Sequence, residues 1–333
     1  MNIGIDGIGL TSILSNRIEI STDDEYPIQM VVKFNEIRIY ESTLYPLDGK
    51  VRFYDLCFLV QEYMRNNLIS SGQLSVSAYA ETVTAYVVYS SIRTSYEDDT
   101  EFLSSHFLTT RSCYTMPRGK SQFFSFFEQG GVDPSGYIDV SFMLDDGSVR
   151  TTRLTNKISA SSTNKIYNFG IESNTLDIRV KSLYPNDSPK VLGGTIVHGN
   201  RVIDFFFTDD EPIESFGFYN AFNVWENYYV FGTSNIKTSF TQKEAICAGV
   251  SSYYNQSASR VVEIKTVPLS YEEALWVNEF LGSKRIVKII PPDDDRDILI
   301  SDITSEISDS DKETISIKFS WKYADPFVWK IYH

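Results

Sequence analysis

Three histidines are the residues of this sequence best suited to acid–base chemistry. They are His106, His198 and His333, and no HExxH, GxSxG or GxxxxGK[ST] motif contains them or occurs elsewhere. Catalysis requires a nucleophile, an acid–base pair or a metal-ligand set at defined spacing. The sequence contains no such set, and we therefore predict that the protein is not an enzyme, has no catalytic residues and needs no cofactor.

The cysteines and acidic runs lack the spacing of a metal site. Cys57, Cys113 and Cys247 are far apart and odd in number, so neither a zinc site nor a disulfide framework is indicated. The run PPDDDRD (291–297) and the two TDDE runs offer the oxygen ligands that Ca²⁺ prefers, but they lack the DxDxDG spacing of a calcium loop. We predict solvated turns between strands and no metal site.

Aromatic residues in FGFYNAFNVWENYYVF (216–231) could bind a ligand without chemistry. Trp225, Tyr228 and Tyr229 could stack on sugar rings and form a glycan-contact platform. The cores of sheets and the interfaces between subunits use the same residue types. Exposed aromatic patches more often mark contact surfaces in general. We keep both hypotheses for these three residues, an interface and a glycan contact.

The elements that must position these residues are predicted to be mainly strands. The sequence contains 21 Tyr, 22 Phe and 4 Trp, and aromatic residues suit a pleated, half-buried surface. The net charge of −14 and the lack of a basic cluster argue against nucleic acid as the main partner. No apolar run of membrane-spanning length and no signal peptide are recognised. We expect the protein to fold in a reducing cytoplasm.

The strongest strand signal lies in YIDVSFMLDDGSVRTTRLT, residues 137–155. Apolar residues occupy every second position from 138 to 144, and Asp146–Gly147 follows. Because Asp-Gly tolerates the positive φ of a tight turn, this segment predicts a β-hairpin. Similar patterns predict a strand in TLDIRVKSLYPNDSP (175–189). They also predict a C-terminal hairpin built from ILISDITSEI and ETISIKFSWKY.

Two segments are predicted to be helices among these strands, at 54–66 and 271–281. Both carry apolar residues at three- and four-residue spacing. Asp55 is placed to cap the first helix. The shared pattern leaves open an internal duplication, with chance similarity as the alternative. Each helix is expected to cover a face or an edge of a sheet and to block uncontrolled strand pairing.

The start of the helix at 271–281 carries a capping signal. Ser270 and Glu273 have the S-x-x-E spacing of a capping box, in which each side chain bonds the backbone of the other residue. Gly282 suits a left-handed helix exit. The side chains expected to face the core are Tyr271, Leu275, Trp276 and Phe280.

These elements predict a mainly β protein. We expect two or three β-sandwich-like or barrel-like modules with one or two short capping helices. The length of 333 residues is compatible with three such modules. They are an N-terminal β module with a helix (1–100), a middle β module (101–200), and a C-terminal β module with a helix and a terminal hairpin (201–333).

The C-terminal region resembles tail or baseplate structural proteins of phages and prophages from gut Bacteroidales. The likeness covers chiefly residues 216–325 and rests on FNVWENYYVFG, VPLSYEEALWVNEFLGSKRIVKI and ILISDITSEI followed by ISIKFSWKYADP. FLTTRS, FFSFFEQGG and MLDDGSVRTTRL add to it. The resemblance implies a virion component that forms a ring or sleeve around a tail axis, assembles in the host cytoplasm and carries no catalytic residues.

We therefore expect a non-catalytic virion protein, a subunit of a phage tail or baseplate. It would act through contacts with its own copies in a ring and with other tail proteins, without membrane insertion. One alternative is a glycan- or receptor-binding module at a tail tip. A further alternative is a polysaccharide hydrolase with two carboxylates about 5–10 Å apart. The 44 acidic residues do not identify such a pair.

Overall fold

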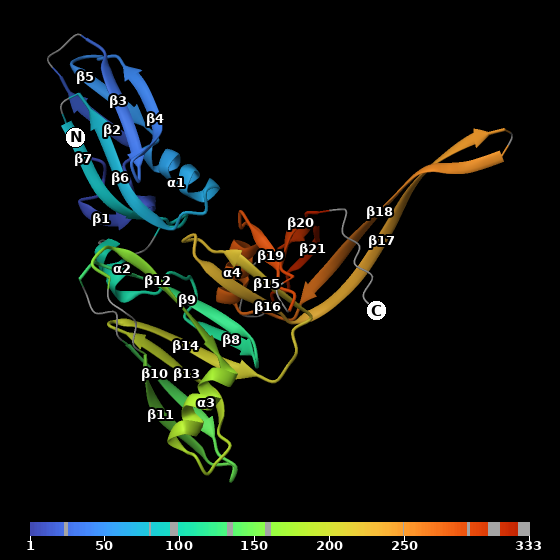
Figure 1. Cartoon of the computed structure of the whole chain (residues 1–333). Coiled ribbons are helices and arrows are strands. Elements are labelled where there is room, and N and C mark those ends of the chain that lie inside the picture. The colour runs from blue at the N-terminus through green and yellow to red at the C-terminus, as the bar shows by residue number, and fades with distance from the viewer. Residues whose placement is uncertain are drawn as a thin grey trace. The chain divides into compact units, whose positions relative to one another are not determined.

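The computed structural model describes residues 1–22, 26–79, 81–93, 99–131, 136–156, 161–248, 250–291, 294–305 and 314–325. The protein is mainly β, with 54% strand and 15% helix, which confirms the predicted fold class (Figure 1). The chain divides into two compact units. Unit 1 contains Met1–Thr208 and Tyr219–Glu226, and unit 2 contains Asp209–Phe218 and Asn227–His333. The predicted boundary near residue 200 lies close to Thr208, where the first segment of unit 1 ends. The predicted boundary near residue 100 falls inside unit 1.

The N-terminal part of unit 1 is a five-stranded sheet and a two-stranded sheet. The first has the order β1 (Gly7–Leu10), β7 (Glu81–Val88), β6 (Ser71–Ala78), β3 (Ile28–Phe34), β4 (Ile37–Leu44). The second pairs β2 (Arg17–Ser21) with β5 (Lys50–Tyr54), and a 3-10 turn, η1 (Thr11–Ile13), follows β1. Every second side chain of β3, from Ile28 to Phe34, is buried, because side chains alternate across a strand.

Helix α1 (Leu56–Asn66) packs on this part of unit 1. It confirms the helix predicted at 54–66, and the four-residue spacing of its buried side chains Leu56, Val60 and Met64 explains its orientation. The capping role predicted for Asp55 is wrong. Asp55 has a φ of 65° and its side chain makes no cap hydrogen bond. Its backbone N–H donates to Asn16 O (2.8 Å) instead, which holds Asp55 in a left-handed turn before the helix.

The middle of unit 1 contains two further sheets. One has the order β11 (Val149–Asn156), β10 (Gly136–Met143), β13 (Lys190–His198), β14 (Arg201–Thr208), β8 (Cys113–Pro117). The other pairs β9 (Ser121–Glu128) with β12 (Lys165–Glu172). The hairpin predicted at 137–155 is confirmed, since β10 and β11 pair throughout and Gly147 adopts a φ of 80° in their turn.

Two helices, α2 (Asp99–Ser105) and α3 (Ser173–Leu183), accompany these sheets. The strand predicted within 175–189 is wrong, because α3 occupies most of it. Leu176 and Val180 are buried, whereas Ile178 between them is 71% exposed. The alternation of apolar residues suggested a strand, but a four-residue spacing is the one that faces the core here.

Unit 2 is built on a seven-stranded sheet. Its order is β16 (Trp225–Val230), β15 (Glu214–Tyr219), β19 (Ile286–Lys288), β20 (Arg296–Thr304), β21 (Lys318–Tyr323), β18 (Val250–Thr266), β17 (Gly232–Cys247). The antiparallel pairing of β20 with β21 confirms the predicted C-terminal strands. The connecting run SDSDK lies outside the described residues.

Helix α4 (Tyr271–Leu281) packs on unit 2 and confirms the helix predicted at 271–281. The capping box is confirmed: Ser270 Oγ accepts from Glu273 N (3.2 Å), and Ser270 N donates to Glu273 Oε2 (3.1 Å). Trp276 and Phe280 are buried as predicted. Tyr271 and Leu275 are 53% and 44% exposed, so their predicted core positions are wrong. The buried stripe runs through Ala274, Trp276, Val277 and Phe280 instead. Gly282 ends the helix with a φ of −90°, not in the predicted left-handed form.

Residues Tyr219–Glu226 belong to unit 1, although the chain on both sides of them belongs to unit 2. Phe222 is fully buried in this segment and stacks on Phe102 of α2, with ring centroids 5.7 Å apart. It shares an apolar cluster with residues of the N-terminal sheet, of α2 and the loop after it, of β9 and of its own segment, namely Leu10, Val88, Phe102, Leu103, Leu108, Phe127, Ala221 and Val224. The segment therefore completes a core to which both the N-terminal and the middle parts of unit 1 contribute.

Asparagine side chains fix this segment. Asn220 Oδ1 accepts from Phe222 N (2.9 Å), and Asn220 Nδ2 donates to Leu108 O (2.8 Å). Asn223, with a φ of 53°, donates from Nδ2 to Met64 O (3.2 Å) in the last turn of α1 and to Ile69 O (3.1 Å) just beyond the helix. Asparagine tolerates positive φ and also offers a donor and an acceptor, which explains its use at this tight, buried turn.

Candidate functional site

His198 and His106, the histidines among the described residues, are held by contacts that stabilise the fold. His198 and Arg201 face each other at the turn between β13 and β14 and are each 4% exposed. His198 Nε2 lies 2.9 Å from Glu128 Oε1, and Arg201 Nη1 donates to the same oxygen at 2.7 Å. Arg201 Nη2 also donates to Leu103 O and Phe127 O, each at 2.6 Å. This buried charge network joins β9 to the β13–β14 hairpin.

Ser105 and His106 are in contact through a hydroxyl and an imidazole, the groups of a catalytic serine–histidine pair. Ser105 Oγ lies 2.8 Å from His106 Nδ1, but it also lies 2.6 Å from Glu101 O, to which it donates. The hydroxyl proton is thus directed at a helix carbonyl and away from the imidazole. His106 stacks on Phe102 (5.0 Å), and burial lowers the pKa of its imidazole. His333 lies outside the described residues.

In the part of the chain that the structure describes, no group of three or more His, Cys, Asp or Glu side chains could hold a metal ion. Residues 23–25 of the first TDDE run, 292–293 of PPDDDRD and the side chain of Cys247 lie outside the described residues. No helix within the described ranges is long and apolar enough to cross a membrane.

The Glu128 network predicts a pH-dependent contribution to stability. Burial raises the pKa of Glu128, but the hydrogen bonds and charges of His198 and Arg201 outweigh burial and hold this pKa below its ordinary value. A lowered folded-state pKa stabilises the fold above the unfolded-state pKa, and this contribution is lost as pH falls through the folded-state pKa. We expect Glu128→Gln to lower the free energy of unfolding by about 1–3 kcal/mol at neutral pH. This loss is smaller than that for a fully buried ion pair, because Glu128 is partly solvated.

The measurement is urea unfolding of both proteins at neutral pH and near pH 4, below the ordinary glutamate pKa of 4.5. The difference between wild type and Glu128→Gln should narrow at the lower pH, because Glu128 of the unfolded wild-type chain then takes up a proton while its lowered pKa keeps it ionised in the folded protein. Asp139→Asn is the matched control. It removes an exposed carboxylate that pairs with Arg153 on β11, and we expect a smaller effect. A difference that stays constant with pH would contradict the assignment.

The predicted aromatic platform is not a surface. Tyr228 and Tyr229 are 5% and 8% exposed, and Trp225 is half-buried with its ring edge-to-face on Tyr219 (5.3 Å). Tyr228 packs instead against Trp276 of α4 (5.2 Å) and Phe280 (4.9 Å). The use of Tyr228 and Tyr229 as exposed interface or glycan contacts is therefore a wrong prediction. Both rings project from strand β16 into the interior and are not exposed on the surface.

The hairpin of β17 and β18 in unit 2, which we call the arm (residues 232–266), is exposed over most of its described residues. Its two strands pair from Gly232↔Thr266 to Cys247↔Val250, with one bulge at Lys243/Glu244. Figure 1 shows them running together as a long two-stranded ribbon. β18 also pairs with β21, but only over Val262–Lys265. The eleven residues of β17 beyond that contact reach about 35 Å at the usual rise per residue.

The described side chains of the arm are exposed over most of its length. Every residue from Thr233 to Phe240 is exposed. Large apolar side chains are among them: Ile236 is 56%, Phe240 70%, Ile246 75% and Val250 67% exposed. Ile236 and Phe240 lie on one face because they are four residues apart in a strand. A two-stranded hairpin without a packed face is marginally stable in water, and exposed apolar side chains of this size are typical of contact surfaces.

The root of the arm is firmly held in unit 2. Val262 and Ile264 of β18 are buried beside Phe319 and Trp321 of β21, with which they pair. Lys237 and Glu263 form an ion pair across the arm where it leaves the sheet. The arm is therefore anchored in the core of unit 2 at one end, while the described side chains of its distal half are mostly exposed.

The arm also differs in charge from the rest of the chain. Residues 232–266 contain four basic side chains, Lys237, Lys243, Arg260 and Lys265, and two acidic ones, Glu244 and Glu263. The rest of the sequence contains 26 basic and 42 acidic residues. The arm is therefore net positive on a chain that is otherwise strongly negative.

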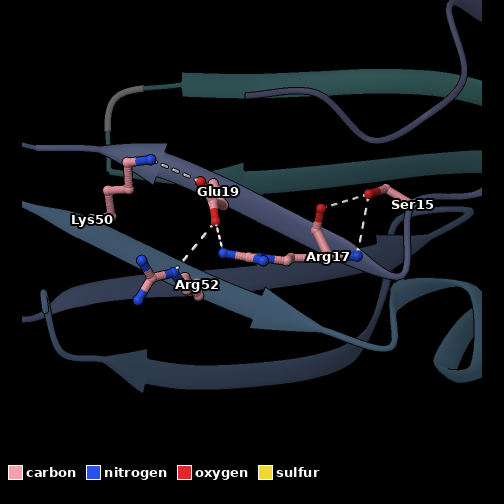
Figure 2. A network of polar contacts seen from close by, with 5 residues as sticks. All are labelled: Ser15, Arg17, Glu19, Lys50 and Arg52. Atoms are coloured by element: carbon pink, nitrogen blue, oxygen red, sulfur yellow. Dashed lines mark hydrogen bonds and ion pairs between the residues drawn. The ribbon is translucent and has the colours of Figure 1, made fainter.

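A second cationic cluster lies on the small sheet of β2 and β5 in unit 1 (Figure 2). Glu19 accepts from Lys50 (3.1 Å) and Arg52 (3.3 Å), and it also contacts Arg17. The hydrogen bond from Lys50 is the largest effect on the Glu19 carboxyl, and the three cations together hold its pKa below the ordinary value. Three cations surround a single carboxylate, so this cluster is another basic patch on an acidic protein.

No protein-family model and no curated protein sequence matches this chain.

Proposed function

We propose that this protein is a non-catalytic structural subunit of a phage tail or baseplate that assembles through its arm. The arm supports the proposal more than any other feature. It is a ribbon of paired strands that projects from a held root and exposes Phe240, Ile246 and Val250. Such a surface has no use in an isolated monomer and is a liability for aggregation unless another chain covers it.

The partner that we propose for the arm is a second copy of this chain. The net positive charge of the arm complements the negative charge of the remaining sequence, so one copy carries both halves of the contact. Contact between an arm and a different surface of the next copy is heterologous. Contacts of that kind close into a ring when the rotation between copies permits, and otherwise form an open filament. Both outcomes suit a component arranged around a tail axis.

Two arm variants test this function. Phe240→Ser removes an aromatic side chain of 70% exposure from the ribbon, and a deletion of residues 240–258, closed by an Asn-Gly turn between the paired Ser239 and Ser259, shortens the arm to its root. We expect wild type to form rings or short filaments in mass photometry and electron microscopy, and both variants to remain monomeric. We also expect the wild-type assemblies to weaken as salt rises, because screening reduces attraction between exposed charges.

The matched control is Tyr271→Ser, which removes an aromatic side chain of 53% exposure from α4 of the same unit. This variant should assemble like wild type. Wild-type protein that stays monomeric at high concentration, or arm variants that assemble normally, would overturn the proposal.

A further inference from the structure

Unit 1 contains a cleft of about 850 Å³ between its N-terminal sheet and two loops of its middle part. One wall comes from β6, β7 and the β3–β4 turn and includes Asn35, Gln73 and Tyr86. The other wall follows β9 and precedes β12, and includes Gln129 and Asn164. The volume is within the range that small-molecule sites of proteins occupy.

The lining of this cleft is polar but uncharged. None of its fourteen residues is Asp, Glu, Lys, Arg or His, although 22% of the sequence is charged. Most of the lining consists of carboxamide and hydroxyl side chains, glycine and a single tyrosine. Such groups offer hydrogen bonds without a charge to neutralise, so the lining favours a neutral ligand that carries many hydroxyl groups.

Two of the carboxamides are fixed by the backbone. Asn35 Oδ1 accepts from Gln73 N (2.8 Å), and Asn164 Oδ1 accepts from Gly130 N (3.0 Å). Each of these bonds uses the carbonyl oxygen and leaves the Nδ2 donors without a bond to a described residue. The side-chain amides of Gln73 and Gln129 likewise make no hydrogen bond within the described part of the chain. The cleft thus has oriented donors on one asparagine of each wall and two adaptable amides beside them.

Tyr86 supplies the aromatic ring of the cleft, and its position is fixed from both ends. Its ring packs on Phe127 with centroids 5.8 Å apart. Its hydroxyl lies 3.0 Å from Ser71 Oγ and donates to Asn164 O (3.2 Å) across the cleft. A fixed tyrosine ring presents an apolar face with a polar edge, which suits the C–H face and the hydroxyls of a pyranose ring.

We propose that this cleft binds a neutral oligosaccharide, with Asn35, Gln73, Gln129 and Asn164 as hydrogen-bonding residues and Tyr86 as the stacking residue. The site goes beyond assembly through the arm. It also differs in place from the aromatic segment at 216–231, whose Tyr228 and Tyr229 are buried. No bond is made or broken in the cleft, so the activity is recognition alone.

The experiment is calorimetric titration of the full-length protein with cellotriose, mannotriose and isomaltotriose, and with trigalacturonate as a charged ligand of similar length. At least one neutral trisaccharide should bind with a dissociation constant of about 1 mM, as expected for a few solvent-accessible hydrogen bonds and one stacked ring. Trigalacturonate should bind at least tenfold more weakly, because carboxylates find no cation in the cleft.

Gln73→Ala and Gln129→Ala test the residues. Neither side chain bonds elsewhere in the described structure, so the fold should be unchanged. We expect each substitution to weaken binding about threefold to tenfold and the double variant to abolish measurable binding. Asn168→Ala, which removes an exposed amide of β12 outside the cleft, is the matched control and should bind like wild type.

The same titrations on Phe240→Ser separate this site from the arm, since loss of assembly should leave sugar binding intact. Absence of binding to every neutral trisaccharide, equal affinity for trigalacturonate, or full affinity in the double variant would each overturn the site. None of these results would affect the oligomeric state on which the assembly proposal depends.

Discussion

Replacing Trp276 by alanine is expected to lower the free energy of unfolding of unit 2 by about 3–5 kcal/mol, the usual effect of deleting a buried large aromatic side chain. Trp276 is 3% exposed. Its ring packs edge-to-face on Phe218 (5.5 Å) and Tyr228 (5.2 Å), which connects α4 to β15 and β16. Alanine would leave a cavity between a helix and the sheet that it covers, where close-packed aromatic neighbours have little freedom to collapse.

Hydrogen–deuterium exchange is the suitable measurement, because it reports on β15, β16 and α4 separately from unit 1. Faster exchange of these elements in Trp276→Ala, with unit 1 unchanged, is the expected pattern. Tyr271→Ala on the same helix is the control, since its side chain is 53% exposed and its loss should change little. Equal protection in wild type and Trp276→Ala would show that this ring does not hold the helix on the sheet.

The second large effect is expected in unit 1 from Phe222→Ala, at about 3–5 kcal/mol. Phe222 is fully buried and packs against residues from separate parts of unit 1, including Leu10 of β1, Val88 of β7 and Phe102 of α2. Its removal should loosen all of these elements together. Thermal unfolding followed by circular dichroism should then show an earlier transition for unit 1.

Phe206→Ala is the matched control, because this phenylalanine of β14 is 56% exposed and lies in the same unit. It should leave the transition of unit 1 nearly unchanged. If both phenylalanine variants unfolded alike, the contacts of Phe222 would not be the ones that hold the core of unit 1 together.

The sequence predicted the elements that depend on contacts between residues close together in the chain. The hairpin turn at Asp146–Gly147 and the capping box of Ser270 and Glu273 are both confirmed, because their chemistry is complete within a few residues. Helix α3 was mistaken for a strand. Leu176, Ile178 and Val180 fit both a period of two and a four-residue spacing, and only the neighbouring sheet decides which of them is buried.

The candidate sites were harder to predict, because they depend on long-range contacts. The polar residues of the arm carry no amphipathic pattern, so nothing local indicates that β17 and β18 pair over their whole length. Tyr228 and Tyr229 are aromatic like many exposed ligand-binding residues, and their burial depends on neighbours such as α4. The cleft near Tyr86 combines residues more than a hundred positions apart in sequence, such as Asn35 and Asn164. The spacing of these residues gave no signal that could have brought them together.

The chain order of the two units has a consequence for cotranslational folding. Residues Asp209–Phe218 belong to unit 2, yet Tyr219–Glu226 supply Phe222 to the core of unit 1. A ribosome therefore finishes the first 208 residues before the peptide that fills this core has been made. Nascent unit 1 should stay protease-sensitive until residue 226 leaves the exit tunnel, and a fragment that stops at Thr208 should remain incompletely folded.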